Sequence, residues 1–311
     1  MDRTVVAAAA STALVPGQRD GPVCEAAGMQ IGALIFPTDH SIRTDRLAIE
    51  LEARGFESLW VTEHTHIPVS RRTPWPGGPE LPDMYRRTLD PFVALAAAAS
   101  VTERLLLGTG ISLVAQHHPI TLAKTVASLD LVSDGRFLFG IGVGWNEDEM
   151  EHHGVDPKQR RAVARECVLA MKRLWTEEAA SFDGRFVKFS PSWSWPKPVQ
   201  SPNPPVIMGG AGGPVTFKHI IEYCEGWMPI HGRREIDDKL PVLRSMAADA
   251  GRDPDSIEVG VFGCPPKPET IERYQALGVK RIALSLPPEG ADTVLPLLDR
   301  YASLVEQFSG R

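Results

Sequence analysis

The sequence has 311 residues, of which 43% are hydrophobic and 23% charged, a balance that excludes both a disordered chain and a mini-protein. Its 33 lysines and arginines against 39 aspartates and glutamates give a formal net charge of −6, with no long run of one sign, so nucleic acid is not an expected partner. No apolar stretch approaches the roughly 20 residues that a membrane span needs, so no membrane association is expected.

The cysteines and the N-terminal residues indicate the compartment. Cysteines at positions 24, 167, 224 and 264 form no Cys-x-x-Cys pair, and no histidine accompanies them at a metal-ligand spacing. This pattern predicts neither disulfides nor a metal site and favours a reduced, cytoplasmic protein. The first 28 residues have no positive excess and only a weak apolar middle, which disfavours a secretory signal. We expect residues 1–28 to be a disordered extension and residues 29–311 to form a single domain.

From residue 30 onward, short apolar runs alternate with helical patterns. The expected strands are residues 31–36, 58–61, 105–107, 137–141, 206–208, 226–230, 257–261 and 280–284. The expected helices are residues 45–54, 91–100, 120–132, 158–175, 215–223, 235–250, 269–277 and 293–308. Eight strands in strict alternation with eight helices predict a parallel α/β barrel, the (β/α)8 or TIM barrel, with a doubly wound open sheet as the alternative.

Two segments are longer than ordinary connections, residues 65–90 after the second strand and residues 177–205 before the fifth. In the second of these insertions, Asp183 and Gly184 lie between alternating apolar and polar residues, which predicts a β-hairpin over residues 180–189.

Functional residues of a (β/α)8 barrel follow the carboxyl ends of its strands. The second strand is followed by Glu63 and His64, a carboxylate beside an imidazole that titrates near neutral pH and suits acid or base chemistry. The alternative is that His64 is an ordinary hydrogen-bonding residue of a loop. The third strand is followed by Gly108-Thr109-Gly110-Ile111-Ser112, where small residues let the backbone approach a flat ligand.

Glycines follow two further strands. Gly140, Gly142 and Gly144 lack the full Gly-x-Gly-x-x-Gly spacing, so a Rossmann site is disfavoured. The run Gly209-Gly210-Ala211-Gly212-Gly213-Pro214 leads into a predicted helix whose first N–H groups suit a phosphate, although a plain glycine-rich connector is the alternative. No Walker A, nucleophile-elbow, HExxH or EF-hand motif occurs, which excludes those classes of site.

Several of these segments resemble the bacterial luciferase-like flavin and deazaflavin oxidoreductases, most closely the branch that uses coenzyme F420. The resemblance covers residues 29–230, and the remainder follows only in the order of elements. It is carried by LWVTEH (59–64), DPFVALAA (90–97), LGTGI (107–111), the stretch from His118-Pro119 to SDGR (133–136), GIGVGW (140–145), Phe186 with PKPVQ (196–200), and residues 209–214.

The resemblance implies a luciferase-like (β/α)8 barrel that binds F420, with FMN as the alternative cofactor. It places the cofactor ring over the bulge after the third strand, where relatives have a cis peptide bond and where Gly110-Ile111 is the matching pair. It assigns Glu63 and His64 as catalytic residues, with His64 transferring the proton. The cofactor-binding residues that it implies are Glu63, Gly110, Ile111, Ser112, Gly144, Asn146, Gly209, Gly210, Ala211, Gly212 and Gly213.

One loop departs from the pattern of this family. Sugar-phosphate dehydrogenases of this branch carry Thr and Lys after the sixth strand, whereas this chain has Pro229-Ile230-His231-Gly232-Arg233, so a sugar phosphate is not the expected substrate. The expected substrate pocket is mostly aromatic and suits a moderately apolar molecule. Its residues are His66, Trp75, Tyr85, Trp145, Trp193 and Trp195.

The expected activity is therefore hydride transfer between F420 and an unidentified small organic substrate. The first alternative is an FMN-dependent monooxygenase that uses reduced flavin and O₂. The second is a catalytically silent barrel that only binds a flavin. The habit of the family implies a homodimer, and no metal is expected.

Overall fold

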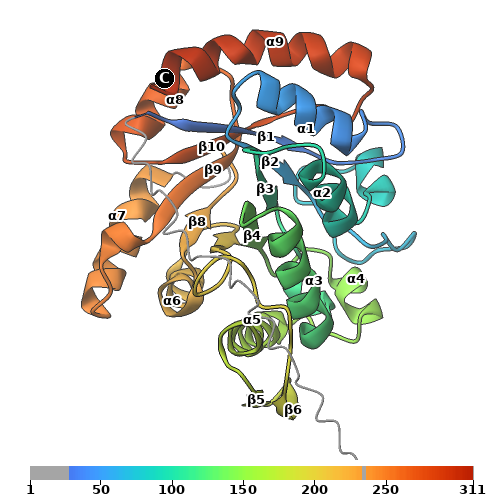
Figure 1. Ribbon diagram of the computed structural model, residues 1–311, viewed down its shortest axis with the longest axis vertical. Coiled ribbons are helices and arrows are strands. Elements are labelled where there is room, and N and C mark those ends of the chain that lie inside the picture. Colours follow the sequence, from blue (N-terminus) through green and yellow to red (C-terminus); the bar gives the residue numbers. More distant parts are fainter. Residues whose placement is uncertain (1–27, 233–235, 311) are drawn as a thin grey trace, which may run out of the picture.

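The computed structural model describes residues 28–232 and 236–310, so residues 1–27 of the expected extension lie outside it. Eight parallel strands close into a barrel in the spatial order β1-β10-β9-β8-β7-β4-β3-β2 (Figure 1). The strands are β1 (Gln30–Ile35), β2 (Ser58–Val61), β3 (Leu106–Thr109), β4 (Phe137–Ile141), β7 (Val206–Gly209), β8 (Gly226–Met228), β9 (Glu258–Cys264) and β10 (Arg281–Ser285). The (β/α)8 prediction is confirmed, and the open-sheet alternative is wrong.

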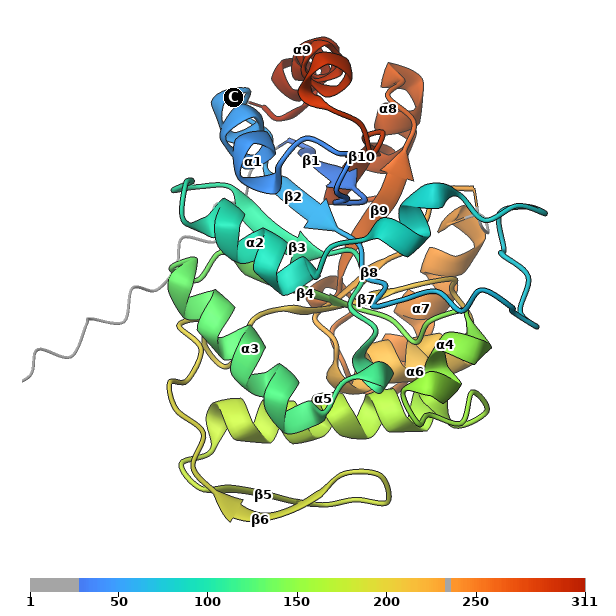
Figure 2. The ribbon, with the colours of Figure 1, turned by 90° about the vertical axis from the view of Figure 1, so that its right-hand side faces the viewer.

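Helices surround the barrel (Figures 1 and 2). They are α1 (Thr44–Ala53), α2 (Pro91–Ala99), α3 (Pro119–Val132), α4 (Glu147–His152), α5 (Arg160–Thr176), α6 (Pro214–Tyr223), α7 (Ile236–Asp249), α8 (Pro268–Ala276) and α9 (Ala291–Phe308). Short 3₁₀ helices are η1 (Asp83–Arg87), η2 (Val114–Gln116) and η3 (Pro254–Ser256). Four of the α-helices begin on proline, whose fixed φ and missing N–H suit that position.

The strands are apolar on both faces because one face packs on the helices and the other fills the barrel. All four residues of β2 are buried, and so are all five of β4. The interior of the barrel is a separate cluster of buried side chains, formed by Trp60, Leu138, Ile207, Met228, Phe262 and Ala283. The barrel is therefore a packed core, and ligands have access only at its ends.

The two insertions lie in different places. Residues 65–90 run over α4, where the guanidinium of Arg72 binds Asp148 and Glu151. The second insertion forms the antiparallel hairpin β5 (Ala180–Asp183) and β6 (Lys188–Ser192), which confirms the predicted hairpin. Figures 1 and 2 both show this hairpin outside the barrel, beyond α5. Only the first insertion therefore approaches the carboxyl ends of the strands.

Candidate functional site

A histidine and a glutamate are paired at the carboxyl end of β2. His64 is 9% exposed, and its Nδ1 lies 2.9 Å from Oε2 and 3.1 Å from Oε1 of Glu149, which is 1% exposed. Because a carboxylate only accepts hydrogen bonds, Nδ1 carries the hydrogen and Nε2 is the ring nitrogen left for a ligand. A carboxylate that orients an imidazole in this way equips it to transfer a proton.

Helix α4 positions Glu149. Asn146 precedes the helix, and its first turn carries Glu147, Asp148 and Glu149, which the helix dipole stabilises there. The side chain of Asp148 accepts hydrogen bonds from the backbone N–H groups of Arg72 and Thr73, so the first insertion is joined to the same turn. The neighbouring Arg72 guanidinium lowers the pKa of the Asp148 carboxyl to about 2. The acidic first turn of α4 therefore binds His64 through Glu149 and the first insertion through Asp148.

Aromatic rings gather beside His64. The ring centroid of Tyr85, from η1, lies 5.2 Å from that of His64, and the ring of Trp145 lies 6.1 Å from His64. Tyr85 also contacts Phe36 at 4.9 Å and Trp75 at 5.9 Å between centroids. The structure therefore brings two of the expected pocket residues, Tyr85 and Trp145, to the histidine, and a third, Trp75, against Tyr85.

The other three expected pocket residues do not join this aromatic set. His66 contacts the end of α4, with its Nε2 2.9 Å from Nδ1 of His152. Trp193 and Trp195 are 79% and 56% exposed, and Lys197, whose ammonium lies over the ring of Trp195, binds the carbonyl groups at the end of α5. Helices of a (β/α)8 barrel run antiparallel to its strands, so the end of α5 lies at the amino-terminal end of the barrel. The assignment of His66, Trp193 and Trp195 to the pocket therefore stays a prediction without support from these contacts.

Glu63 has a different environment from the one expected. Its Oε2 accepts the backbone N–H of Leu113 at 2.5 Å, and its Oε1 lies 2.6 Å from Nε2 of His117. Both oxygens of Glu63 therefore have protein partners, and the expected catalytic role of this residue stays a prediction.

The loops after β2, β3 and β4 hold polar side chains that are buried without a partner among the described residues. These atoms are Oγ1 of Thr62, Oγ of Ser112, and both amide atoms of Gln116 and of Asn146. All four side chains are at least nine-tenths buried. A buried polar group without a partner costs about 1–3 kcal/mol, so a folded protein seldom keeps several together unless a ligand pairs with them.

The peptide bond between Gly110 and Ile111 is cis, as the resemblance implies. The side chain of Ile111 packs against the backbone of two glycines. A Cβ at Gly142 would lie 2.4 Å from its Cδ1, and a Cβ at Gly209 would lie 2.6 Å from its Cγ2. Gly144, with φ +74°, lies against Met150 and Gln116. The glycines after β4 and β7 therefore let the loop after β3 pack closely.

The glycine run after β7 divides into packing and open positions. A Cβ at Gly212 would meet the rings of Phe217 and Trp227, whereas one at Gly210 or Gly213 would meet nothing within 4 Å. Gly210, Ala211 and Gly213 are the positions of the run with exposed or half-exposed backbone, and Gly213 precedes the first turn of α6. This is an open backbone surface at a helix N-terminus, the geometry that binds phosphate.

One arginine of α5, Arg161, lies beside this surface. Nη1 of Arg161 is 3.5 Å from Oγ1 of Thr216, in the first turn of α6. Burial lowers the pKa of Arg161, and the charge of Arg160 lowers it further. The Arg161 cation next to the start of α6 makes this corner of the site favourable to an anion.

The model of a known family matches most of the chain. The family is described as "Luciferase-like monooxygenase", and the match spans residues 32–294. The chain belongs to this family. It is therefore a luciferase-like enzyme, and the open glycine run and the His64 pair lie in the fold that the family shares.

Several relatives are similar over most of this luciferase-like chain. The uncharacterized protein Rv0953c of Mycobacterium tuberculosis (strain ATCC 25618 / H37Rv) is 43% identical over 280 residues, which cover 88% of this chain and 98% of that protein. The F420-dependent hydroxymycolic acid dehydrogenase of the same organism is 28% identical over 244 residues, 76% of this chain and 62% of that protein.

Solved structures share the luciferase-like fold. Monooxygenase RslO1 from Streptomyces bottropensis has a TM-score of 0.70 at 22% identity, over 90% of this chain and 99% of that one. An F420-dependent secondary alcohol dehydrogenase, solved with an F420-acetone adduct, has a TM-score of 0.69 at 19% identity, over 91% of this chain and 99% of that one. At these identities the likeness shows the fold alone.

Sequence reasoning missed several residues of the site. Glu149 lies in the run Glu147-Asp148-Glu149, which is typical of an exposed helix start, and only the fold brings it to His64. Gln116 and His117 precede the proline of α3 and had no distinguishing spacing. Arg161 was one basic residue among many. None of these carried a signal that could be separated from an ordinary polar surface.

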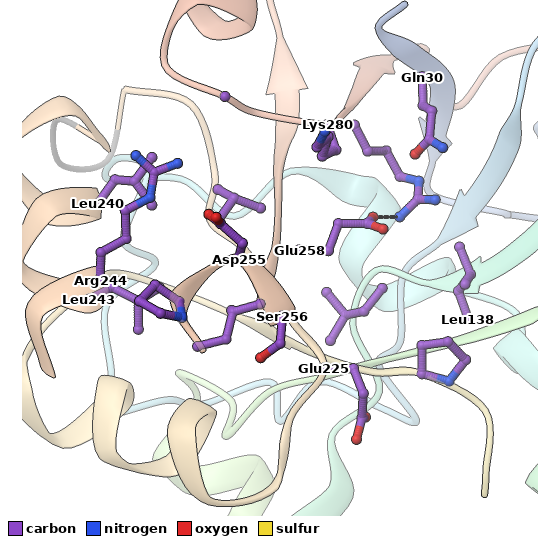
Figure 3. A pocket seen from close by; sticks show the side chains of 17 residues that line it. Gln30, Leu138, Glu225, Leu240, Leu243, Arg244, Asp255, Ser256, Glu258 and Lys280 are labelled. Carbon is purple, nitrogen blue, oxygen red and sulfur yellow. Dashed lines mark hydrogen bonds and ion pairs between the residues drawn. The ribbon is translucent and has the colours of Figure 1, made fainter. Parts of the chain in front are cut away.

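A cavity of about 750 Å³ lies at the opposite end of the barrel, around the first residues of the strands (Figure 3). Arg281, 4% exposed, binds Glu258 there, and its Nη2 lies 2.6 Å from Oε1 of Glu57. These charges satisfy one another and face no oriented imidazole. Because luciferase-like barrels, like other (β/α)8 enzymes, have their chemistry at the carboxyl ends of the strands, we do not place the site in this cavity.

Within residues 28–232 and 236–310, no helix is long and apolar enough to cross a membrane, and no group of three or more His, Cys, Asp or Glu side chains could hold a metal ion. The cysteines of this part of the chain, Cys167, Cys224 and Cys264, are free and buried. Burial raises the pKa of the Cys167 and Cys264 thiols to about 12, so these thiols are unreactive.

Proposed function

We propose that this luciferase-like enzyme transfers a hydride between coenzyme F420 and a small organic substrate. The observation that carries the proposal is the combination of an oriented His64 with buried polar side chains that lack protein partners. Relatives with a named activity support F420 as the cofactor. They include an F420-dependent hydroxymycolic acid dehydrogenase and an F420-dependent glucose-6-phosphate dehydrogenase.

The residues present fit such a cofactor. The unpaired Ser112, Gln116 and Asn146 would hydrogen-bond its ring, and the open backbone at Gly210, Ala211 and Gly213 would hold its phosphate, with the Arg161 cation beside it. When bound, F420 supplies a ring carbon that accepts or donates the hydride. His64 then gives or takes the accompanying proton at Nε2, while Glu149 holds Nδ1 and keeps the imidazole in one tautomer.

The aromatic side chains beside His64 indicate the substrate. Trp75, Tyr85 and Trp145 present rings, and the Trp75 indole N–H has no partner among the described residues. An uncharged, moderately apolar alcohol or carbonyl compound fits this lining. The segment Pro229-Ile230-His231 after β8 offers no lysine for a sugar phosphate, so we do not propose one.

Cofactor titration tests the proposal. Purified protein is titrated with F420 and with FMN, and the quenching of each cofactor's fluorescence is followed. We expect saturable quenching of F420, and we expect Asn146→Leu to weaken it because the amide that pairs with the ring is lost. Tight binding of FMN with no response to F420 would instead support an FMN-dependent monooxygenase, and a monooxygenase solved in complex with FMN shares this fold.

Turnover separates an enzyme from a silent binding barrel. The F420-loaded protein is offered a panel of secondary alcohols and ketones, and the absorbance of oxidised F420 is followed in both directions. Binding of F420 without turnover of any member, in wild type and His64→Ala alike, would favour the silent barrel.

We also propose a homodimer that joins through α2 and α3. Their outer faces expose Val93 (71%), Leu131 (49%) and Val132 (58%), and a groove of about 550 Å³ runs between the two helices. Light scattering after gel filtration should give twice the chain mass for wild type and a smaller mass for Val93→Glu. A monomeric wild type would contradict the dimer.

A further inference from the structure

The carboxylate of Glu63 joins two segments of the site. Glu63 directly follows the buried Thr62 at the end of β2, and its side chain is 2% exposed. Its two oxygens reach the backbone N–H of Leu113 and the imidazole of His117, which lie on either side of η2. One buried side chain therefore holds both ends of this short helix.

The segment that Glu63 holds carries the unpaired polar groups. Residues 110–117 include the cis peptide bond, Ser112 and Gln116. On its other side the same segment is joined to β4, because Ser112 N–H donates to the Gly140 carbonyl and Gly142 N–H donates to the Ser112 carbonyl. The position of Ser112 thus depends on β4, and that of Gln116 on the Glu63 contacts.

The surroundings of His117 favour its charged form. Burial lowers the pKa of His117, but the hydrogen bond to Glu63 and the negative charges of Glu63 and Asp90 outweigh it, so the pKa is raised above 6.5. The ring of Phe92 on α2 lies against His117, and the charge of His117 also acts on His153. Lys124 lines the same groove, but its ammonium donates to the Trp195 carbonyl. A charged imidazole against a buried carboxylate makes a strong hydrogen bond.

We propose that His117 is a positioning residue, which holds Glu63 and so keeps residues 110–117 in the conformation that binds the cofactor. The proposal rests on the proposed function for its ligand. His117 itself lies in the wall of the groove between α2 and α3, outside the aromatic set beside His64. It therefore acts on the cofactor only through Glu63 and the loop.

Three variants test the role of the imidazole. His117→Leu removes the donor and leaves the Glu63 oxygen without its partner, whereas His117→Gln keeps a neutral amide donor. His118→Gln is the matched control, because His118 is exposed and its side chain does not cap α3. We expect His117→Leu to raise the dissociation constant for F420 by about tenfold, with His117→Gln between it and wild type and the control unchanged.

The pH dependence gives a readout that a merely structural role would not move. A raised pKa in the folded protein means that the ion pair is complete at pH 6 and is lost as the pH rises through that pKa. The wild-type affinity for F420 should therefore be highest below pH 6.5 and fall as the pH rises through the raised pKa of His117, and this fall should be absent in His117→Gln. An affinity profile that is the same in wild type and His117→Gln would overturn the proposal.

Hydrogen exchange tests the proposal without any ligand. At one fixed pH, peptides that cover residues 110–117 should exchange faster in His117→Leu than in His118→Gln, because the Leu113 amide is bonded to Glu63. Equal exchange in the two variants contradicts the positioning role even if F420 binds. Failure of wild type to bind F420, with the exchange difference present, contradicts only the proposed cofactor.

Discussion

The two ends of the barrel differ in whether all of their buried polar side chains have protein partners. At the amino end, the Arg281 guanidinium is enclosed by the carboxylates of Glu57 and Glu258. At the carboxyl end, Ser112 and Asn146 are as deeply buried, yet their polar atoms have no partner among the described residues. Both arrangements cost desolvation energy, but only the first recovers it within the chain.

Paired and unpaired buried groups should affect different properties of the protein, the paired ones its stability and the unpaired ones its ligand binding. A charge that is satisfied inside the protein contributes to folding, and its loss should leave the active-site loops intact. An unsatisfied group lowers the stability of the free protein and recovers energy when a ligand arrives. Substitutions at the two ends should therefore have separate effects, on unfolding at the amino end and on binding and turnover at the carboxyl end.

The largest effect is expected for His64→Ala. Loss of a residue that transfers a proton lowers turnover by about 10²–10⁴-fold. The variant also leaves the buried Glu149 carboxylate without its partner, so kcat is measured at a temperature where the variant is shown to be folded. The measurement is kcat with the best alcohol or ketone of the panel. His66→Ala is the matched control, since His66 contacts His152 on α4 and should keep most of the activity. Equal kcat in the two variants would remove His64 from the mechanism.

The next effect is expected for Arg281→Met at the other end. Removing the guanidinium leaves Glu57 and Glu258 without the charge that they enclose, which costs about 3–5 kcal/mol when a pair is buried. We take about 3 kcal/mol, because Glu258 is partly exposed. Urea unfolding measures the loss, with the exposed neighbour Lys280→Met as control. A loss below about 1 kcal/mol would refute the assignment of this cluster to stability.

A smaller effect is expected for Ser112→Ala, and this variant should be as stable as wild type or more stable, in contrast to Arg281→Met. Its hydroxyl is buried without a partner, so its removal should leave the free energy of unfolding unchanged or raise it, while F420 binds about tenfold more weakly. Ser133→Ala is the contrasting control, because that buried hydroxyl donates to the Asp130 carbonyl. The control should lose about 1 kcal/mol of stability and bind F420 normally. Reduced stability in Ser112→Ala would show that its hydroxyl has a protein partner.

The smallest effect is expected for Gly213→Ala. Its φ of 175° is ordinary extended backbone and a Cβ there meets nothing within 4 Å, so the folded protein tolerates alanine. The new methyl group would occupy space beside the N–H groups that are to hold the phosphate, and we expect a threefold to tenfold weaker binding of F420, about 1 kcal/mol. Gly290→Ala, also open, precedes α9 and serves as control. Identical binding in both variants would place the phosphate elsewhere.

The order of the elements could be predicted because each carries its own local signal. The buried strands read as apolar runs, and prolines and glycines mark the ends of many helices. Boundaries differ by a few residues, as in β9, which begins at Glu258 and extends to Cys264. Helix α4 could not be predicted, because EDEMEH is short and acidic, and its stability depends on contacts with residues 65–90.

The site could be predicted only where its residues follow strands directly. His64, Ser112 and Asn146 belong to such loops, and the structure places them at one end of the barrel. The partner of His64 could not be predicted, since Glu149 is 85 residues away and comes from another loop. Trp193 and Trp195 were assigned to the pocket because they are aromatic and lie in a long insertion, but that insertion covers α5.

The closure of the barrel has a consequence for synthesis of the chain. Gln30 pairs with Arg281, and the N–H of Met29 donates to the carbonyl of Phe308. The outer edge of β1 therefore has no partner until β10 and α9 have been synthesised. At about 5–20 residues per second, translation leaves β1 with a free edge for on the order of ten to fifty seconds. A nascent chain that ends before β10 has an open sheet with two unpaired edge strands. Such edges can pair with strands of other chains. The seam between β1 and β10 is therefore where premature termination would lead to aggregation.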